Sequence, residues 1–307
     1  MSSLTLDPAA LKNYLPHRGH NLLPDQVVMS ADRLSAVSTT HIPPNDLRGR
    51  ELFSRRDRGE GRWWYEPAIA ELLAITGVPL LHEQLSPHGQ VAVFSMIGKL
   101  TMPVLAPLHR PIIGYAQITR NRQGFTSFST RAEVDGVTVL EAEVMSGSAV
   151  LAEVASFPVR PFHGQLPSEP VDPTLLDYKA KHLRFADAVM HVDTAARSLA
   201  TSYTYPVNHP FCATHFPGAA LMMGVTQWGA VADAAWIARA RFGLHGPVVA
   251  QGTIKRQDGT PVVDVRDLVV GDHDGSPRLM STKRIAFREP VRPGDGLIVE
   301  VTVAPHT

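Results

Sequence analysis

A proline-rich stretch near the middle of the chain limits most strongly how this sequence can fold. It spans residues 157–173 and contains Pro158, Pro161, Gly164, Pro167, Pro170 and Pro173. Because proline fixes φ and has no amide hydrogen to donate, such a stretch can form neither a helix nor a central strand. The sequence therefore predicts two domains, residues 1–155 and residues 181–307, joined by a surface linker over residues 156–180.

Each half shows the same order of features: an apolar segment, a loop, one long apolar helix and then several strands. The first helix is expected over residues 67–75 and ends near Gly77, and the second is expected over residues 221–242 and ends at Gly243. Because the helix and the sheet must both bury apolar surface, we expect a sheet wrapped around one central helix in each half. An internal duplication is the simplest explanation of the repeated order.

Segments with β-branched residues and alternating polarity follow each helix. An Asp-Gly pair between two such segments is a strong signal for a two-residue hairpin. The segments are residues 131–134 and 137–144 around Asp135-Gly136, residues 251–256 and 262–270 around Asp258-Gly259, and residues 296–303 at the end of the chain. The sequence therefore predicts antiparallel sheets.

The composition excludes several classes of protein. The chain carries 29 basic and 29 acidic side chains, so its charge gives no reason to expect a nucleic acid or an anionic membrane as partner. The single cysteine, Cys212, can form neither an internal disulfide nor a cysteine-rich zinc site. Residues 1–14 lack the pattern of a signal peptide, and we expect a cytoplasmic protein.

Residues 219–240 are strongly apolar, but Gln227 and Asp233 interrupt them, so we predict a buried core helix there instead of a membrane span.

Three segments carry a more specific signal. Residues 15–18 read Leu-Pro-His-Arg, residues 208–218 end in His-Phe-Pro-Gly and precede Gly224-Val225, and residues 287–295 read Phe-Arg-Glu-Pro-Val-Arg-Pro-Gly-Asp. In this order they resemble the LPHR, HFPG and closing motifs of the 3-hydroxyacyl-ACP dehydratases. The resemblance implies a hotdog fold. Together with the duplication, it implies an α+β double hotdog that forms a pseudo-dimer over most of the chain.

The same resemblance implies a composite active site. In those dehydratases the histidine of HFPG acts with an acidic residue that follows it by fourteen positions and lies in the central helix of the partner hotdog. Here the histidine position holds His215 in the second half and Asp57 in the first, and the acidic position holds Gly229 and Glu71 respectively. The resemblance therefore implies one live site, with His215 and Glu71, and one degenerate site that combines Asp57 with Gln227 and Gly229.

The starts of the helices and the HFPG loop are the expected substrate contacts. Free N–H groups and the positive dipole end of a helix can hold a thioester oxygen that gains negative charge. In the first half this helix start lies near Tyr65 and Glu66, with Pro67 in the first turn. The residues that we assign to the substrate are Trp64, Glu66, Phe216, Gly218 and Gly224.

A basic run precedes the first helix and contains Arg55, Arg56, Arg58 and Arg62. Such a run is usually a solvated loop. It can also bind the phosphates of coenzyme A or phosphopantetheine, and Arg55 and Arg62 are our candidates for that role.

Trp63, Trp64 and Tyr65 at the start of the first helix are the most unusual local feature. They either plug the core, with the tyrosine hydroxyl bonded to the backbone, or make Tyr65 a nucleophile that the helix N-terminus activates. The position of Tyr65, the chain length and the duplication resemble the bifunctional acyltransferase/decarboxylases of leinamycin-type polyketide pathways. This resemblance implies that Tyr65 takes the acyl group of methylmalonyl-CoA, which is decarboxylated and passed to an acyl carrier protein.

Acyl transfer with decarboxylation is our first hypothesis, and two others stay open. A dehydratase or isomerase would use His215 to remove the α proton and Glu71 to protonate the leaving hydroxyl. A non-catalytic acyl-binding hotdog would tolerate the loss of both Tyr65 and His215. We expect acyl-CoA and an acyl carrier protein as partners, a thioester of coenzyme A or phosphopantetheine as substrate, and no metal or permanently bound cofactor, and we leave homodimer formation open.

Overall fold

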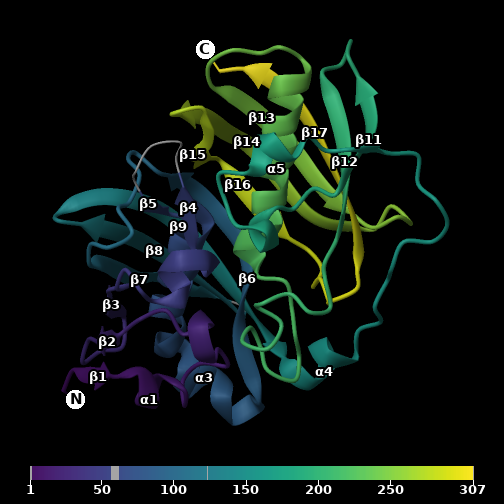
Figure 1. Cartoon of the computed structure of the whole chain (residues 1–307). Coiled ribbons are helices and arrows are strands. Elements are labelled where there is room, and N and C mark those ends of the chain that lie inside the picture. Colours follow the sequence, from purple (N-terminus) through teal and green to yellow (C-terminus); the bar gives the residue numbers. More distant parts are fainter. Residues whose placement is uncertain (1, 57–61, 123, 307) are drawn as a thin grey trace.

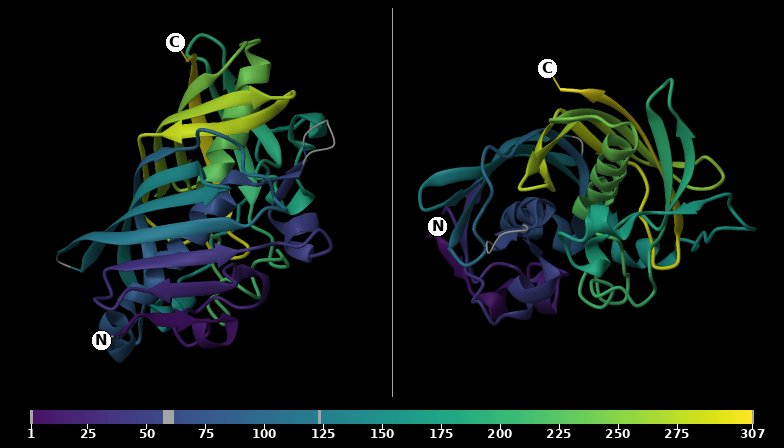
Figure 2. Two further views of the ribbon diagram at one scale, coloured as in Figure 1. Left: turned by 90° about the vertical axis from the view of Figure 1, so that its left-hand side faces the viewer. Right: turned by 45° about the horizontal axis from the view of Figure 1, so that its top comes forward.

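The computed structural model describes residues 2–56, 62–122 and 124–306. Within these residues, fifteen strands form one continuous antiparallel sheet. The sheet curls around the two long helices (Figures 1 and 2). The strands of the first half, in their order across the sheet, are β1 (Leu4–Leu6), β2 (Gln26–Met29), β3 (Ser35–Thr40), β7 (Ile112–Arg122), β8 (Phe125–Val134), β9 (Val137–Val150) and β6 (Gln90–Thr101). Those of the second half are β15 (Ser276–Thr282), β14 (Pro261–His273), β13 (Val248–Lys255), β17 (Gly296–Pro305), β12 (Ser198–Thr204), β11 (Ala188–Asp193) and β10 (Glu169–Pro170), and β16 (Arg284–Phe287) pairs with β14 and β6.

Each half encloses one long helix, α2 (Glu66–Gly77) in the first and α5 (Gly224–Arg241) in the second. All residues of α2 except Ala74 are buried, and α5 is buried from Val225 to Ala238. A helix that is apolar on nearly every side must lie inside the protein, and the curled sheet supplies that interior. The chain is a double hotdog.

Shorter elements connect these parts. The short helices are α1 (Pro8–Leu11), η1 (Gly19–Asn21), η2 (Arg48–Leu52), η3 (Val78–Leu81), α3 (His82–Leu85), η4 (Ser86–His88), α4 (Leu151–Ser156), η5 (Pro173–Leu176) and η6 (Lys181–Leu183), and β4 (Ser54–Arg56) pairs with β5 (Arg62–Trp64). Residues 157–168 contain neither a helix nor a strand. None of the helices in the described part of the chain combines the length and the apolar character needed to cross a bilayer.

The glycine and turn residues that the sequence analysis uses to predict the ends of helices and strands are confirmed in part. Gly243 follows α5 with a φ of 61°, as expected for a helix end, and Asp135-Gly136 forms the tight turn between β8 and β9 with φ values of 52° and 77°. Gly77 does not end its helix in this way, because its φ of −83° lets the chain continue into η3. A Cβ at Gly77 would lie 3.3 Å from the ring of Phe128, so close packing explains this glycine.

Two predicted boundaries are wrong. The second helix starts at Gly224 and not at residue 221, because the amide of Met222 donates to the carbonyl of Val291 and holds this segment extended. The turn around Asp258-Gly259 is longer than two residues, since β13 ends at Lys255 and β14 starts at Pro261.

The two halves share their layers but differ in strand order. β6, the first strand after α2, lies at the inner edge of its half, where it pairs with β15 and β16. β13, the first strand after α5, lies inside its half, between β14 and β17. The pairing of β6 with β15 and β16 joins the halves into one sheet, and α2 contacts α5 on the inner side. The space beside these two helices is where a composite site can form.

Candidate active site

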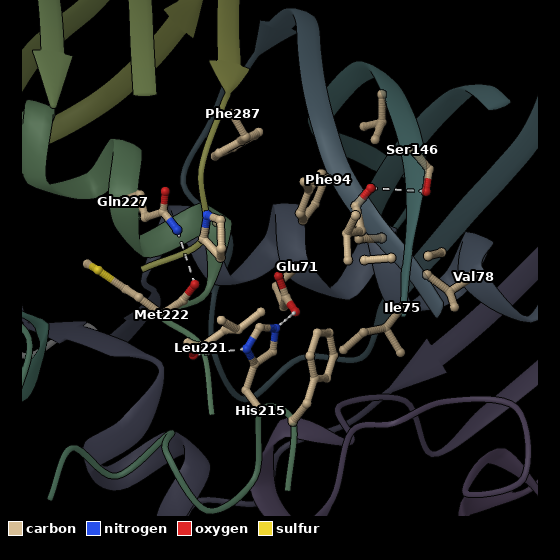
Figure 3. A pocket seen from close by; sticks show the side chains of 18 of the residues that line it. Glu71, Ile75, Val78, Phe94, Ser146, His215, Leu221, Met222, Gln227 and Phe287 are labelled. Atoms are coloured by element: carbon tan, nitrogen blue, oxygen red, sulfur yellow. Dashed lines mark hydrogen bonds and ion pairs between the residues drawn. The ribbon is translucent and has the colours of Figure 1, made fainter. Parts of the chain in front are cut away.

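A cavity of about 260 Å³ lies between the two halves. Its walls come from α2, β6, β8 and β9 of the first half and from the segments before α5 and after β16 of the second. Most of the lining is apolar, and it includes three titratable side chains that lie close together, His17, Glu71 and His215. Figure 3 shows Glu71 and His215 near the middle of the cavity. An apolar cavity with a few converging polar groups is the usual form of a small-molecule site.

Three segments that are distant in sequence meet at this cavity. The amide of Arg18 donates to the carbonyl of Thr214 over 2.9 Å, which places residues 15–18 against the HFPG loop. The ring centroids of His17 and Phe216 are 5.1 Å apart. Phe287 and the three residues after it line the opposite side. The three segments on which the dehydratase resemblance depends therefore surround one site.

His215 and Glu71 form the centre of the site. Nε2 of His215 lies 3.7 Å from Oε1 of Glu71, and their side chains are 8% and 3% exposed. Nδ1 of His215 lies 3.2 Å from the carbonyl oxygen of Leu221, which can only accept a hydrogen bond, so Nδ1 carries the proton and Nε2 keeps a free lone pair.

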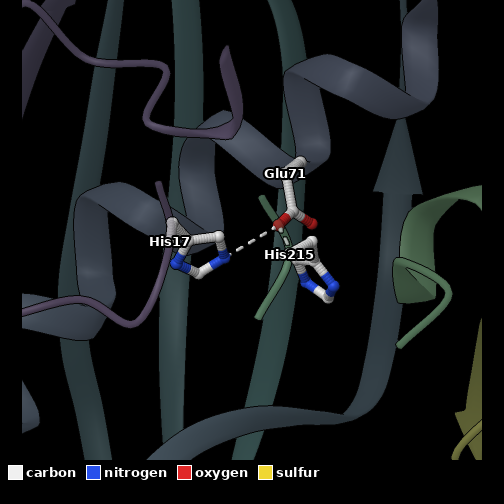
Figure 4. A group of neighbouring side chains, drawn as sticks. All are labelled: His17, Glu71 and His215. Carbon is white, nitrogen blue, oxygen red and sulfur yellow. Dashed lines mark ion pairs between the residues drawn. The ribbon is translucent and has the colours of Figure 1, made fainter. Parts of the chain in front are cut away.

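A second imidazole holds the carboxylate from the other side. Nε2 of His17 lies 3.3 Å from the same oxygen of Glu71, and the His17 and His215 ring centroids are 5.2 Å apart (Figure 4). His17 stands in the LPHR motif, but the sequence analysis assigns it no chemical role, because no spacing along the chain relates it to Glu71 or His215.

Burial and these neighbours set the protonation states. Burial lowers the pKa of His215 to about 4, although the nearby Glu71 charge acts in the opposite direction. Burial alone would raise the pKa of Glu71, but its contacts with His17 and His215 bring that pKa below its ordinary value. At neutral pH the site therefore holds a neutral imidazole beside an ionised carboxylate.

The start of α5 faces the cavity through Gly224. The amides of Thr226 and Gln227 already donate to the carbonyl of Met223. The amides of Gly224 and Val225, at the very start of the helix, lie at the positive end of its dipole and have no carbonyl within the helix to bond. A Cβ at Gly224 would lie 3.2 Å from Phe287 and 3.3 Å from Phe94, so glycine keeps this approach open. The α5 start can therefore donate to a carbonyl oxygen in the cavity.

The start of α2, which sequence reasoning assigned this role, is already engaged. Oε1 of Glu66 accepts from Arg55 over 2.7 Å and from the amide of Leu279 over 3.3 Å. The amide of Tyr65 donates to the carbonyl of Phe53. The Glu66 carboxylate is therefore bound by Arg55 and Leu279 and does not line the cavity.

Tyr65, Trp64 and Glu66 lie in a second buried region of the protein. This region contains a set of charged side chains, Glu66 among them, that we call the charged cluster. The charged cluster consists of the ion pairs Arg55–Glu66, at 2.7 Å, and Lys179–Asp233, at 2.5 Å. Nζ of Lys179 lies 5.1 Å from the centre of the Tyr65 ring. Neither Tyr65 nor Trp64 is among the described residues that line the cavity, and Trp64 is fully buried in the core.

The charged cluster lies where the degenerate site was expected. Gly229 holds the sequence position that corresponds to Glu71, and a Cβ there would lie 2.5 Å from the hydroxyl oxygen of Tyr65. Burial, followed by the charge of Asp233, raises the pKa of Tyr65 well above its ordinary value. This environment favours the neutral phenol and opposes the phenolate that the sequence analysis invoked.

Gly229→Ala is expected to destabilise the protein by about 1–3 kcal/mol, because the new methyl group would overlap the Tyr65 hydroxyl. Tyr65→Phe removes that oxygen, so Gly229→Ala should cost less in the Tyr65→Phe background. Chemical denaturation of the wild type, both single variants and the double variant measures the coupling. Equal costs in the two backgrounds would contradict the contact between Tyr65 and α5.

Several other assignments need correction. Arg55 is fully buried and donates to Glu66 and to the carbonyl of Pro277, so it cannot receive phosphates at the surface. Arg62 and Gly218 are exposed and lie outside the cavity lining. Gln227, assigned to the degenerate site, lines the His215 cavity instead, because it sits in the first turn of α5. Asp57 and Arg58 lie outside the described residues. Phe216 and Gly224, which the sequence analysis assigns to the substrate, line the cavity.

A metal ion is a further possibility at this site, whereas the sequence analysis expects no metal. His17, Glu71 and His215 each offer one nitrogen or oxygen atom, and these atoms lie within 4.8 Å of one another. Two histidines and one glutamate are a known ligand set for catalytic zinc. In the described part of the chain, these three residues could hold such an ion, and no step proposed below depends on one.

No protein-family model and no curated protein matches the chain. Several solved structures are similar to the chain. A thioesterase candidate from Novosphingobium aromaticivorans is 13% identical, with 91% of this chain and 98% of that chain covered and a TM-score of 0.40. The dehydratase heterocomplex ApeI:P from Xenorhabdus doucetiae is 12% identical, with 48% and 97% covered and a TM-score of 0.36. A mutant of the fluoroacetyl-CoA-specific thioesterase FlK is 11% identical, with 39% and 87% covered and a TM-score of 0.31. The double-hotdog assignment rests on the strands and helices themselves.

Proposed function

We propose that the protein interconverts 3-hydroxyacyl and 2-enoyl thioesters by removal or addition of water. The observation that carries the proposal is the pair of His215 and Glu71, buried in an apolar cavity beside the start of α5. A base without its proton, an ionised carboxylate and unused helix amides are the groups that this reaction needs.

Dehydration starts with proton removal. The thioester oxygen accepts from the first-turn amides of α5 at Gly224, which brings C2 toward His215. The Nε2 lone pair of His215 takes a proton from C2, and the electron pair of the C2–H bond forms an enolate. The helix amides stabilise the negative charge on the thioester oxygen.

The second step expels water. The enolate electrons form the C2=C3 bond while the C3–O bond breaks. The proton held by His215 passes to the leaving hydroxyl, directly or through Glu71, whose Oε1 lies 3.7 Å from Nε2. Water leaves, and His215 and Glu71 return to their starting protonation states, so hydration is the exact reverse.

His17 acts as a positioning residue in this scheme. Its Nε2 lies 3.3 Å from Oε1 of Glu71, the oxygen that also faces His215 (Figure 4). The contact lowers the pKa of Glu71 and restricts its orientation. The surrounding apolar walls limit the access of other water molecules.

Acyl transfer with decarboxylation remains a different proposal for the same fold. It requires the Tyr65 hydroxyl to reach the acyl carbon, whereas burial and Asp233 raise the pKa of that phenol. The hydration chemistry is supported better, because its groups line the cavity. Incubation with methylmalonyl-CoA and intact-mass measurement tests acyl transfer: a propionyl-sized adduct that disappears in Tyr65→Phe would favour it.

The direct test uses crotonyl-CoA and 3-hydroxybutyryl-CoA with the purified protein. We expect each to convert to the other without release of free thiol, followed by enoyl absorbance and a thiol reagent. Release of coenzyme A without hydration would favour a thioesterase and contradict the proposal.

The pH profile of hydration is a further expected result. Burial lowers the pKa of His215 to about 4, so its neutral form, which acts as the base, persists from neutral pH down to that value. kcat/KM should therefore stay constant across about pH 6–8 and fall only as the pH drops toward 4. Circular dichroism at each pH controls for unfolding. An acid limb near 6.5, the ordinary histidine value, would contradict the buried neutral base.

A further inference from the structure

A second cavity, of about 290 Å³, lies directly beside the site. Residues 13–16, the segment from His82 to Val91 and Leu151 contribute to its walls. Val78 and Ala92 line both cavities. Val78 begins η3, at the end of α2, and Ala92 lies on β6, so these two side chains stand where the first cavity meets the second.

We propose that Val78 and Ala92 form a partition that limits the length of the acyl chain, so that the site takes medium-chain acyl thioesters. The inference rests on the proposed function, since the occupant is the acyl chain of the thioester. With the carbonyl at Gly224 and C2 and C3 at His215 and Glu71, the remaining carbons extend away from α5. Figure 3 shows Ile75 and Val78 on the side opposite Met222 and Gln227.

This end of the cavity suits a hydrocarbon. Ile75, Val78, Phe128 and Val144 line the cavity and have no polar side-chain atoms. The hydroxyl of Thr130, in the same wall, donates to the carbonyl of Ala142 over 2.9 Å, so its hydrogen is already used. An apolar chain therefore meets no unpaired donor from Thr130 as it extends.

The volume sets the length. At roughly 30 Å³ for a water-sized group, a cavity of about 260 Å³ holds about nine such groups, and a methylene is of similar size. The thioester and C2 and C3 occupy part of this space, which points to acyl chains of about six to eight carbons. Removing the two methyl groups of Val78 would join the cavities and more than double the space.

The test measures binding of alkyl-CoA thioethers, which cannot react, with chains of 4 to about 16 carbons. Calorimetry on the wild type should show affinity rising about fourfold per methylene up to roughly eight carbons and falling beyond. In Val78→Ala the optimum should move to longer chains, and the 12-carbon thioether should bind at least tenfold tighter than to the wild type. Val91→Ala is the matched control, because Val91 lines the second cavity only.

Val78→Thr is a second variant for the case that Val78→Ala folds poorly. Threonine keeps the shape of valine but adds a hydroxyl, so it should weaken binding of chains that reach the partition and leave the 4-carbon thioether unchanged. An unchanged length profile in Val78→Ala and Val78→Thr, or an equal shift in Val91→Ala, overturns the partition.

Different results would contradict the partition at Val78 and Ala92 and the proposed hydration of enoyl thioesters. A shifted binding profile in a protein that does not hydrate any enoyl thioester would support the partition and remove the proposed function. Hydration of enoyl thioesters with the same length profile in all variants would support the function and remove the partition. Absence of thioether binding at every length would overturn the partition directly.

Discussion

Replacement of His215 by alanine is expected to lower kcat/KM for crotonyl-CoA hydration by about 10²–10⁴-fold. The reason is the loss of the Nε2 lone pair, which lies 3.7 Å from Glu71 and is the base available in the cavity at neutral pH. Glu71→Gln, which keeps the shape of the side chain, should cause a loss of similar size. Because both groups move the same proton, the double variant should be little worse than either single variant.

Tyr65→Phe is the informative control for this experiment. Tyr65 is buried against α5 and does not line the cavity, so its variant should retain most hydration activity. Circular dichroism and melting temperature establish that each variant is folded. Wild-type activity in His215→Ala, or loss of hydration in a folded Tyr65→Phe protein, would contradict the assignment of the site.

Removal of Lys179 is expected to have the largest effect on stability. Nζ of Lys179 lies 2.5 Å from Oδ1 of Asp233, and the two side chains are 0% and 1% exposed. Oδ2 of Asp233 accepts from the amide of Phe185 over 2.8 Å. Lys179→Met leaves a buried carboxylate without its cation, which typically costs about 3–5 kcal/mol. The melting temperature should fall by roughly 6–15 °C.

A double variant and an exposed pair control for this prediction. In Lys179→Met combined with Asp233→Asn, the neutral amide can still accept from Phe185, so part of the stability should return. The pair Arg110–Asp135 has the similar distance of 2.8 Å but side chains that are 58% and 52% exposed, so Arg110→Ala should change the melting temperature little. Equal effects of Lys179→Met and Arg110→Ala would show that burial does not strengthen the Lys179 contact.

Among the described residues, the charged cluster occupies the region in which the second composite site was expected. Gly229 is the counterpart of Glu71 in the second half, so a second site of the same kind would need a carboxylate at this position. The Tyr65 hydroxyl already fills the space beside this glycine. Arg55, Glu66, Lys179 and Asp233 occupy the surrounding interior as ion pairs. The second position thus holds buried structural contacts in place of a cavity with a free base.

Local patterns in the sequence determined the two central helices and the Asp135-Gly136 turn, because periodicity and turn residues are short-range properties. The pairing of Glu71 with His215 is not a short-range property, and the sequence indicated it only through the resemblance to the dehydratase motifs. The contact of His17 with Glu71 had no such signal, since no spacing along the chain relates these two residues.

Only the tertiary structure decided the strand order, the burial of Arg55 and the place of Tyr65. A basic residue before a helix is expected at the surface unless its partner is known, and the partners of Arg55 include Glu66 and the distant carbonyl of Pro277. Likewise, the environment of Tyr65 comes from Gly229 and Lys179, more than a hundred residues away. Pattern reasoning fails at such positions because pKa, burial and access to a cavity depend on contacts between segments that folding brings together.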